Sequence, residues 1–122
     1  MNAPSRLRFR REDRLLRKAE FDRVFEAGRR GFAKGLLVFV AESAAGRSRL
    51  GLVTSRRFGG AVARNRARRL VREAFRHERA GFVRPLDLVV LPQAGGFPDR
   101  MQEVRAALVT AVQRALRSEA RR

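Results

Sequence analysis

The feature that most constrains this chain is a long stretch, residues 60–79, in which apolar and basic positions recur with the period of an α-helix. It reads GAVARNRARRLVREAFRHER. At about 100° per residue, one side of the predicted helix carries Ala63, Ala67, Leu70, Val71, Ala74 and Phe75. The other side carries Arg64, Asn65, Arg66, Arg68, Arg69, Arg72 and Arg76. The stretch therefore predicts an amphipathic helix that packs on a core and presents guanidinium groups outward.

This guanidinium side suits a polyanionic partner. A guanidinium donates hydrogen bonds in a planar fork that matches phosphate oxygens and base edges. Within the stretch only Glu73 and Glu78 are acidic, so pairing along the helix cannot neutralise the arginines. Any one of these arginines could be an ordinary solvated residue. So many on one arc favour binding to an external polyanion.

The composition of the whole chain points the same way. Its 122 residues suit a single domain, and its net charge of +17 favours nucleic acid, which releases counterions on binding. The longest apolar run, residues 36–41, is far shorter than the roughly 18 residues that span a membrane. We therefore expect no membrane partner. The absence of cysteine excludes disulfides and zinc fingers and is compatible with the cytoplasm.

The remaining patterns predict a small α+β domain. A first helix is expected over residues 15–27, ended by Gly28, and a last helix over residues 99–117. Two apolar runs, residues 36–42 and 49–55, are expected to pair as a hairpin, and residues 86–91 to form a third strand. There is room for another short strand near residues 31–35. We expect a flexible basic arm over residues 1–14, one domain over residues 15–117 and a basic tail over residues 118–122.

The residues do not predict a catalytic site on the protein. Its acidic residues are scattered over several predicted elements, whereas a two-metal nuclease needs carboxylates that converge. Asp22 and Glu26 are neighbours on the first helix, where a solvated ion-pair face is the simpler interpretation. His77 is the only histidine, which excludes catalysis by a histidine pair. We expect no metal site on the protein, which is predicted to be a binder.

The central stretch also carries a family resemblance. Residues 55–76, SRRFGGAVARNRARRLVREAFR, resemble the signature of the bacterial ribonuclease P protein component, whose Arg-Asn-Arg motif opens the same helix. The similarity continues in EFDRVF at residues 20–25 and DLVVL at residues 87–91, and it covers residues 15–117. It implies an α-β-β-β-α-β-α sandwich of the ribosomal protein S5 domain 2 type, with a left-handed β-α-β crossover that the usual right-handed rule would not predict.

The resemblance further implies a function. Members of this family associate with a catalytic RNA, and the complex cleaves precursor tRNA to mature its 5′ end. The RNA subunit and its Mg²⁺ ions perform the chemistry, and the protein carries no cofactor. The partners implied are the catalytic RNA and the 5′ leader of precursor tRNA, in the cytoplasm, without DNA.

Carried over by position, two groups of residues would bind RNA. The catalytic RNA would contact Arg64, Asn65, Arg66, Arg68, Arg69, Arg72 and Arg76. The leader would pass through a cleft lined by Phe21, Phe25, Phe39, Ser55, Arg56 and Arg57. The family often has tyrosine where Phe39 stands, so a hydroxyl contact is lost here. On spacing alone, Phe21 and Phe25 are more typical of a core than of a nucleobase platform.

Two other functions fit the same basic helix. A general structured-RNA-binding or ribosomal protein would bind other RNAs equally well and would not change a cleavage rate. A DNA-binding protein would use the helix for recognition in a groove, but a strand and glycines precede it in place of the helix and turn that such motifs need. We rank the DNA-binding hypothesis last.

Overall fold

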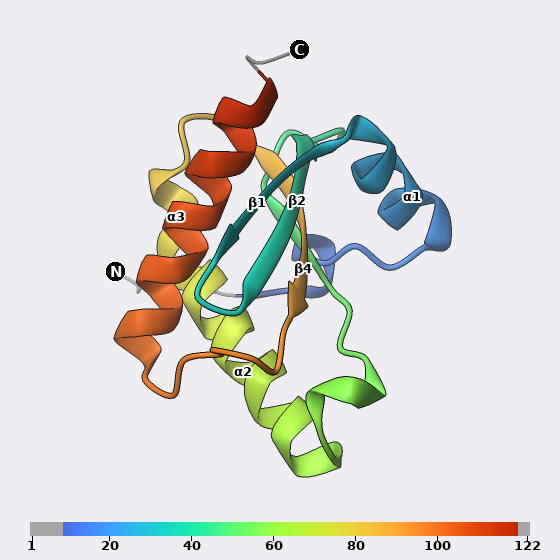
Figure 1. Cartoon of the computed structure of the whole chain (residues 1–122). Coiled ribbons are helices and arrows are strands. Elements are labelled where there is room, and N and C mark those ends of the chain that lie inside the picture. The colour runs from blue at the N-terminus through green and yellow to red at the C-terminus, as the bar shows by residue number, and fades with distance from the viewer. Residues whose placement is uncertain (1–8, 120–122) are drawn as a thin grey trace, which may run out of the picture.

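The computed structural model describes residues 9–119, which form one sheet with helices on both faces (Figure 1). Within this range the α-helices are α1 (Lys18–Ala27), α2 (Ala61–Glu78) and α3 (Met101–Glu119), and the short 3-10 helices are η2 (Arg11–Asp13), η3 (Arg56–Phe58) and η4 (Arg79–Gly81). The strands are β1 (Arg29–Ala33), β2 (Leu36–Glu42), β3 (Arg49–Leu52) and β4 (Leu86–Pro92). The α+β class and the predicted α-β-β-β-α-β-α order are confirmed.

The sheet is mixed, with strand order β1-β2-β4-β3. Strand β2 pairs antiparallel with both β1 and β4, whereas β3 pairs parallel with β4. Parallel strands require a crossover connection, and α2 supplies it between β3 and β4. The left-handed sense of this crossover stays a prediction.

The predicted hairpin between residues 36–42 and 49–55 is wrong. Strand β4 lies between β2 and β3, so the two do not pair. Six of the seven β4 residues are buried, and a strand so placed needs a hydrogen-bonded neighbour on each edge. The hairpin joins β2 to β1, the short strand expected near residues 31–35. Its turn at Lys34 and Gly35 has φ angles of 39° and 78°, as a type I′ turn requires.

Alternate residues of the strands face two different cores. Val38 and Val40 of β2 join the larger core, which α2 and α3 cover. The intervening Phe39 and Ala41 join a smaller core with Val24 of α1. Figure 1 shows the result, with α1 alone on one face of the sheet and α2 and α3 on the other.

Two element boundaries differ from the prediction by three residues, and β1 and α3 are each displaced by two. Helix α1 begins at Lys18, because Leu15 is buried in extended chain whose N–H donates to the Leu50 carbonyl at 3.0 Å. Strand β3 ends at Leu52, short of residue 55. Gly28 ends α1 with a φ of 77°, the left-handed conformation that favours glycine.

The prediction of a flexible arm over residues 1–14 is wrong for residues 9–14; residues 1–8 lie outside the described residues. The Phe9 ring meets Phe75 edge-on, with centroids 6.0 Å apart, and Asp13 is buried. Arg14 forms a parallel bridge with Leu50. The domain therefore includes residues 9–14. The first two residues of the predicted tail, 118 and 119, belong to α3, and residues 120–122 are outside the described range.

Candidate nucleic-acid interface

Helix α2 packs much as its periodicity predicts. Ala67, Val71, Ala74 and Phe75 are buried, and Leu70 packs partly against the same core. Ala63, which we expected on the apolar side, is exposed together with Ala61 and Val62, because the first turn extends beyond the core. The buried positions fix the rotation of α2 and so decide which side chains face solvent.

The seven predicted RNA-binding residues of α2 form a set that we call the basic face. None of them is fully buried. The exposed members are Asn65, Arg66 and Arg69, and the half-buried members are Arg64, Arg68, Arg72 and Arg76. Six of these side chains lie on the side of α2 away from the core, whereas Arg64, seven residues before Val71, lies in line with the buried positions but in the first turn, beyond the core.

The arginines at the start of the basic face are held by neutral oxygens. Arg64 Nη1 donates to the Gly59 carbonyl and Arg66 Nη2 to the Asp99 carbonyl, both at 3.0 Å. Arg68 Nη1 donates to Thr54 Oγ1 at 2.8 Å. Each guanidinium has five N–H groups, so these bonds orient the side chain and leave donors for another acceptor. They also leave the positive charge uncompensated.

The two acidic residues of α2 do little to neutralise this face. Glu78 pairs with Arg105 of α3, with 2.6 Å between Oε2 and Nε. Glu73 forms an ion pair with Arg76, so this arginine offers less net charge than the others. Burial, and then the charges of neighbouring arginines, lower the pKa of Arg72. Burial is the larger cause of this pKa shift, and the charges of Arg14, Arg68 and Arg69 add to it.

The three predicted leader-binding phenylalanines also lie together, on the face of the sheet that α1 covers. Phe21, Phe25 and Phe39, which we call the aromatic face, are half-buried at the edge of the smaller core. Phe25 and Phe39 meet edge-on, with ring centroids 4.9 Å apart. Phe21 lies on Gly51, where an added Cβ would come within 2.6 Å of the ring. Each ring is thus fixed by packing and keeps part of its surface open.

Sequence reasoning missed residues that extend the aromatic face. Phe32, Leu37 and Leu91 pair in register across β1, β2 and β4, and so share one side of the sheet. Phe32 is 48% exposed, and the other two are half-buried. Residues 36–41 are all apolar, so the sequence gives no alternation that would show which of them face α1. Only the register does so.

Ser55, Arg56 and Arg57 lie between the two surfaces in the sequence. All three are exposed, after the strand that carries Gly51 and before α2. The Phe58 ring anchors this connection by meeting Phe97 edge-on at 5.3 Å. These hydroxyl and guanidinium donors therefore connect the aromatic face to the basic face along the chain.

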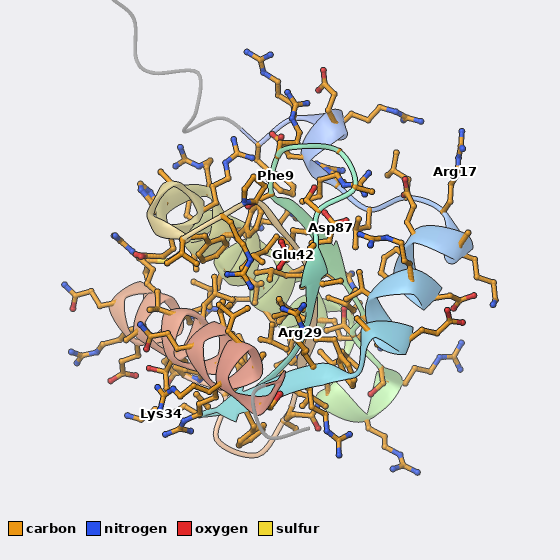
Figure 2. All side chains as sticks on the ribbon, turned by 90° about the horizontal axis from the view of Figure 1, so that it is seen from above. Phe9, Arg17, Arg29, Lys34, Glu42 and Asp87 are labelled. Carbon is orange, nitrogen blue, oxygen red and sulfur yellow. The ribbon has the colours of Figure 1, made fainter. Side chains whose placement is uncertain are left out.

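A buried carboxylate holds α1 against the sheet. Asp87 of β4 is fully buried and accepts hydrogen bonds from Arg49 Nε at 3.0 Å and Arg49 Nη2 at 2.8 Å. Arg23 Nη2 of α1 donates to it at 2.7 Å. Figure 2 shows Asp87 in the interior, on the side of the sheet that faces α1. Because α1 carries two phenylalanines of the aromatic face, this cluster sets their position over the sheet.

Glu20 extends the same cluster along α1. Its Oε2 lies 3.3 Å from Arg49 Nη1, and its Oε1 accepts the N–H groups of Arg17 and Leu16 at 3.0 and 2.7 Å. These two backbone hydrogen bonds hold the pKa of Glu20 below its ordinary value. The side chain thus caps the start of α1, which has no Ser, Thr or Asn to do so.

The other titratable groups form ordinary surface pairs. Lys18 Nζ lies 2.7 Å from Asp22 Oδ2, the ion-pair face that we expected on α1. His77 Nε2 lies 3.5 Å from Glu73 Oε2 at the end of α2. Across residues 9–119, no three His, Asp or Glu side chains gather in a way that could hold a metal ion. In the same range, no helix is both long and apolar enough to cross a bilayer.

Comparison with known proteins gives a consistent result. The family model described as Ribonuclease P matches residues 9–116. The ribonuclease P protein component of Maridesulfovibrio salexigens is 42% identical over 91 residues, which are 73% of each chain. The solved RNase P protein of Thermotoga maritima superimposes with a TM-score of 0.69 at 31% identity, covering 79% of this chain and 91% of that one. The solved RNase P protein of Staphylococcus aureus superimposes with a TM-score of 0.70 at 22% identity, covering 83% of this chain and 93% of that one. With these matches and this fold, the chain belongs to the ribonuclease P protein family.

Proposed function

We propose that this chain is the protein subunit of a ribonuclease P ribonucleoprotein that assists the endonucleolytic 5′ maturation of precursor tRNA in the cytoplasm. The observation that carries the proposal is the basic face, whose leading arginines are oriented by neutral oxygens and not neutralised. Such a surface binds phosphates through charge-assisted hydrogen bonds and releases counterions from the RNA. In this proposal it docks on the catalytic RNA.

The aromatic face would receive the 5′ leader. A single strand exposes its bases, and stacking on a protein ring contributes about 1–3 kcal/mol per base without reading the sequence. Phe21, Phe25 and Phe39 offer partly open rings on a rigid support, and the exposed Ser55, Arg56 and Arg57 could bind the leader phosphates. A binder built in this way accepts the varied leaders of different precursors.

The chemistry is assigned to the RNA subunit with its Mg²⁺ ions. On the protein, Asp87 and Glu20 are engaged by arginines, and Glu73 and Glu78 likewise. The protein's contribution is to hold the leader and to offset phosphate repulsion between the two RNAs, which lowers the Mg²⁺ concentration that the complex needs.

Single-turnover cleavage of a precursor tRNA at low Mg²⁺ tests this function. The reaction is run with a bacterial ribonuclease P RNA alone, with the protein alone and with both. We expect cleavage at the mature 5′ end to be stimulated only when both are present. Cleavage by the protein alone would refute the assignment of chemistry to RNA. No stimulation, with equal binding to unrelated structured RNAs, would favour a general RNA-binding protein.

The basic face gives a salt-dependent prediction. Arg64→Ala and Arg66→Ala should each weaken binding to the catalytic RNA and reduce the slope of log affinity against log salt by about one for each lost phosphate contact. Filter binding over a series of salt concentrations measures both. Arg114→Ala is the matched control, because Arg114 also donates to a carbonyl, that of Phe32 at 2.7 Å, but lies on α3. Equal slope changes in all three variants would argue against a docking role for the basic face.

The aromatic face gives a prediction that separates leader binding from docking. Gly51→Ala would place a Cβ within 2.6 Å of the Phe21 ring and displace it. Affinity for precursor tRNA should fall by about tenfold, in line with the loss of one stacked base, while affinity for mature tRNA stays unchanged. Gly81→Ala is the control, since a Cβ there meets nothing within 4 Å. Equal losses for precursor and mature tRNA would contradict a leader site.

A further inference from the structure

A cavity of about 500 Å³ lies beside the C-terminal end of α2, outside the two surfaces described so far. The fold assembles it from the segment before α1, the connection between β2 and β3, and the connection between α2 and β4. We call it the Asp13 pocket. Its polar wall is made by Arg10, Asp13, Arg47, Arg79 and Arg84.

The Asp13 pocket has an excess of positive charge. The Asp13 side chain is 6% exposed, accepts the Arg10 N–H at 2.8 Å, and lies 3.0 Å from Arg79 Nη1. Arg47 is held loosely, with its Nε 3.9 Å from Asp13 Oδ1 and 48% of its side chain exposed. Arg84 pairs with Glu42, a second carboxylate, at 2.5 Å. The arginines outnumber both carboxylates, so the pocket attracts an anion.

The rest of the wall is apolar. It includes Phe82, Val83 and Pro85, and Val83 is 77% exposed. An apolar wall beside several guanidiniums matches a nucleotide, which joins a flat base and a ribose to a phosphate. An inorganic anion would use only the arginines, and an apolar ligand only the other wall.

We propose that the Asp13 pocket binds one nucleotide of an RNA strand, with the phosphate on Arg10 and Arg47 and the base or ribose against Val83 and Pro85. The inference rests on the proposed function for the identity of the polymer. Arg79 lies fifteen residues beyond Arg64, which is about 22 Å along a helix axis. The pocket therefore contacts a different part of the RNA from the start of the basic face, and the two contacts together fix the orientation of the protein.

Two-dimensional NMR of the isolated full chain tests the pocket directly. The probes are 5′-AMP, adenosine and a short adenosine oligonucleotide without terminal phosphates, and the reporters are the amides of Ser48, Phe82 and Val83, which line the pocket. We expect 5′-AMP and the oligonucleotide to shift these signals at lower concentration than adenosine. Arg47→Gln should lower the affinity for 5′-AMP and for the oligonucleotide by roughly tenfold each, as the loss of a charge-assisted hydrogen bond predicts.

Two further variants make the test specific. Val83→Ser should lower the affinity for 5′-AMP by roughly threefold and leave the affinity for inorganic phosphate unchanged, because only the nucleotide contacts the apolar wall. Lys34→Gln, which removes a charge at the other end of β2, should bind like the unmodified protein. Equal effects of Arg47→Gln and Lys34→Gln would overturn the proposal. Binding of 5′-AMP but not of the oligonucleotide would overturn its assignment to RNA. Neither result depends on the cleavage assay, so the two proposals can fail separately.

Discussion

Replacing Asp87 with alanine should lower the free energy of unfolding by about 3–5 kcal/mol, the usual cost of removing one partner from a buried ion pair. Asp87 is fully buried and accepts three hydrogen bonds from Arg49 and Arg23. Its loss would leave the Arg49 guanidinium, whose side chain is only 13% exposed, without its main counterion. It would also release α1 from the sheet, so leader affinity should fall with stability.

Urea unfolding followed by circular dichroism measures this effect. Asp22→Ala is the matched control, because Asp22 also pairs with a cation, Lys18, at 2.7 Å but on the surface of α1. That variant should lose less than about 1 kcal/mol, as exposed pairs do. If the two variants lose the same amount, the Asp87 cluster does not hold α1 in place.

Replacing Gly31 with alanine should destabilise the protein by at least about 3 kcal/mol, at or above the upper end of the range for overpacked cores. Strand β1 passes so close to α3 that an added Cβ would lie 2.0 Å from the Ala111 carbonyl oxygen and 2.7 Å from the Ala115 nitrogen. These are backbone atoms of a helix and cannot rotate away. Either α3 moves off the sheet or β1 leaves its pairing with β2.

The same unfolding experiment checks this prediction, with Gly95→Ala as its control, since a Cβ at Gly95 meets nothing within 4 Å. A loss below about 1 kcal/mol for Gly31→Ala would show that α3 adjusts without cost. RNA binding by Gly31→Ala, measured where the variant is still folded, should be nearly normal. The basic face lies on α2, whereas the Cβ added at Gly31 meets α3, at Ala111 and Ala115.

The sequence predicts helices better than strand pairing in this protein. The basic face could be read directly, because helical periodicity is local and Val71 and Phe75 recur one turn apart. The pairing of β2 with β4 could not be predicted in this way, because it joins residues far apart in the chain and because every residue from 36 to 41 is apolar. Residues 36–42 and 49–55 are consecutive apolar runs, so local reasoning paired them as a hairpin, which is wrong.

The candidate site was predicted unevenly for similar reasons. The three phenylalanines of the aromatic face came from a family resemblance, whereas Phe32, Leu37 and Leu91 needed the register of the sheet. Asp87 was counted among scattered acids, although one charged residue inside an apolar strand is itself a sign of a buried ion pair. Charge alone made residues 9–14 look like a flexible arm, yet Phe9 and Asp13 pack against the domain.

The central place of β4 has a consequence for how the chain folds. The hairpin of β1 and β2 closes through a short turn. Strands β2 and β3, however, both pair with β4, which follows α2 in the sequence. Bringing distant strands together requires closing a long loop, which slows folding. On the ribosome, the sheet cannot be completed until residue 92 has left the exit tunnel, and until then the apolar residues of β2 are without one of their neighbours. The highly charged helix that follows β3 repels other copies of the chain during that interval.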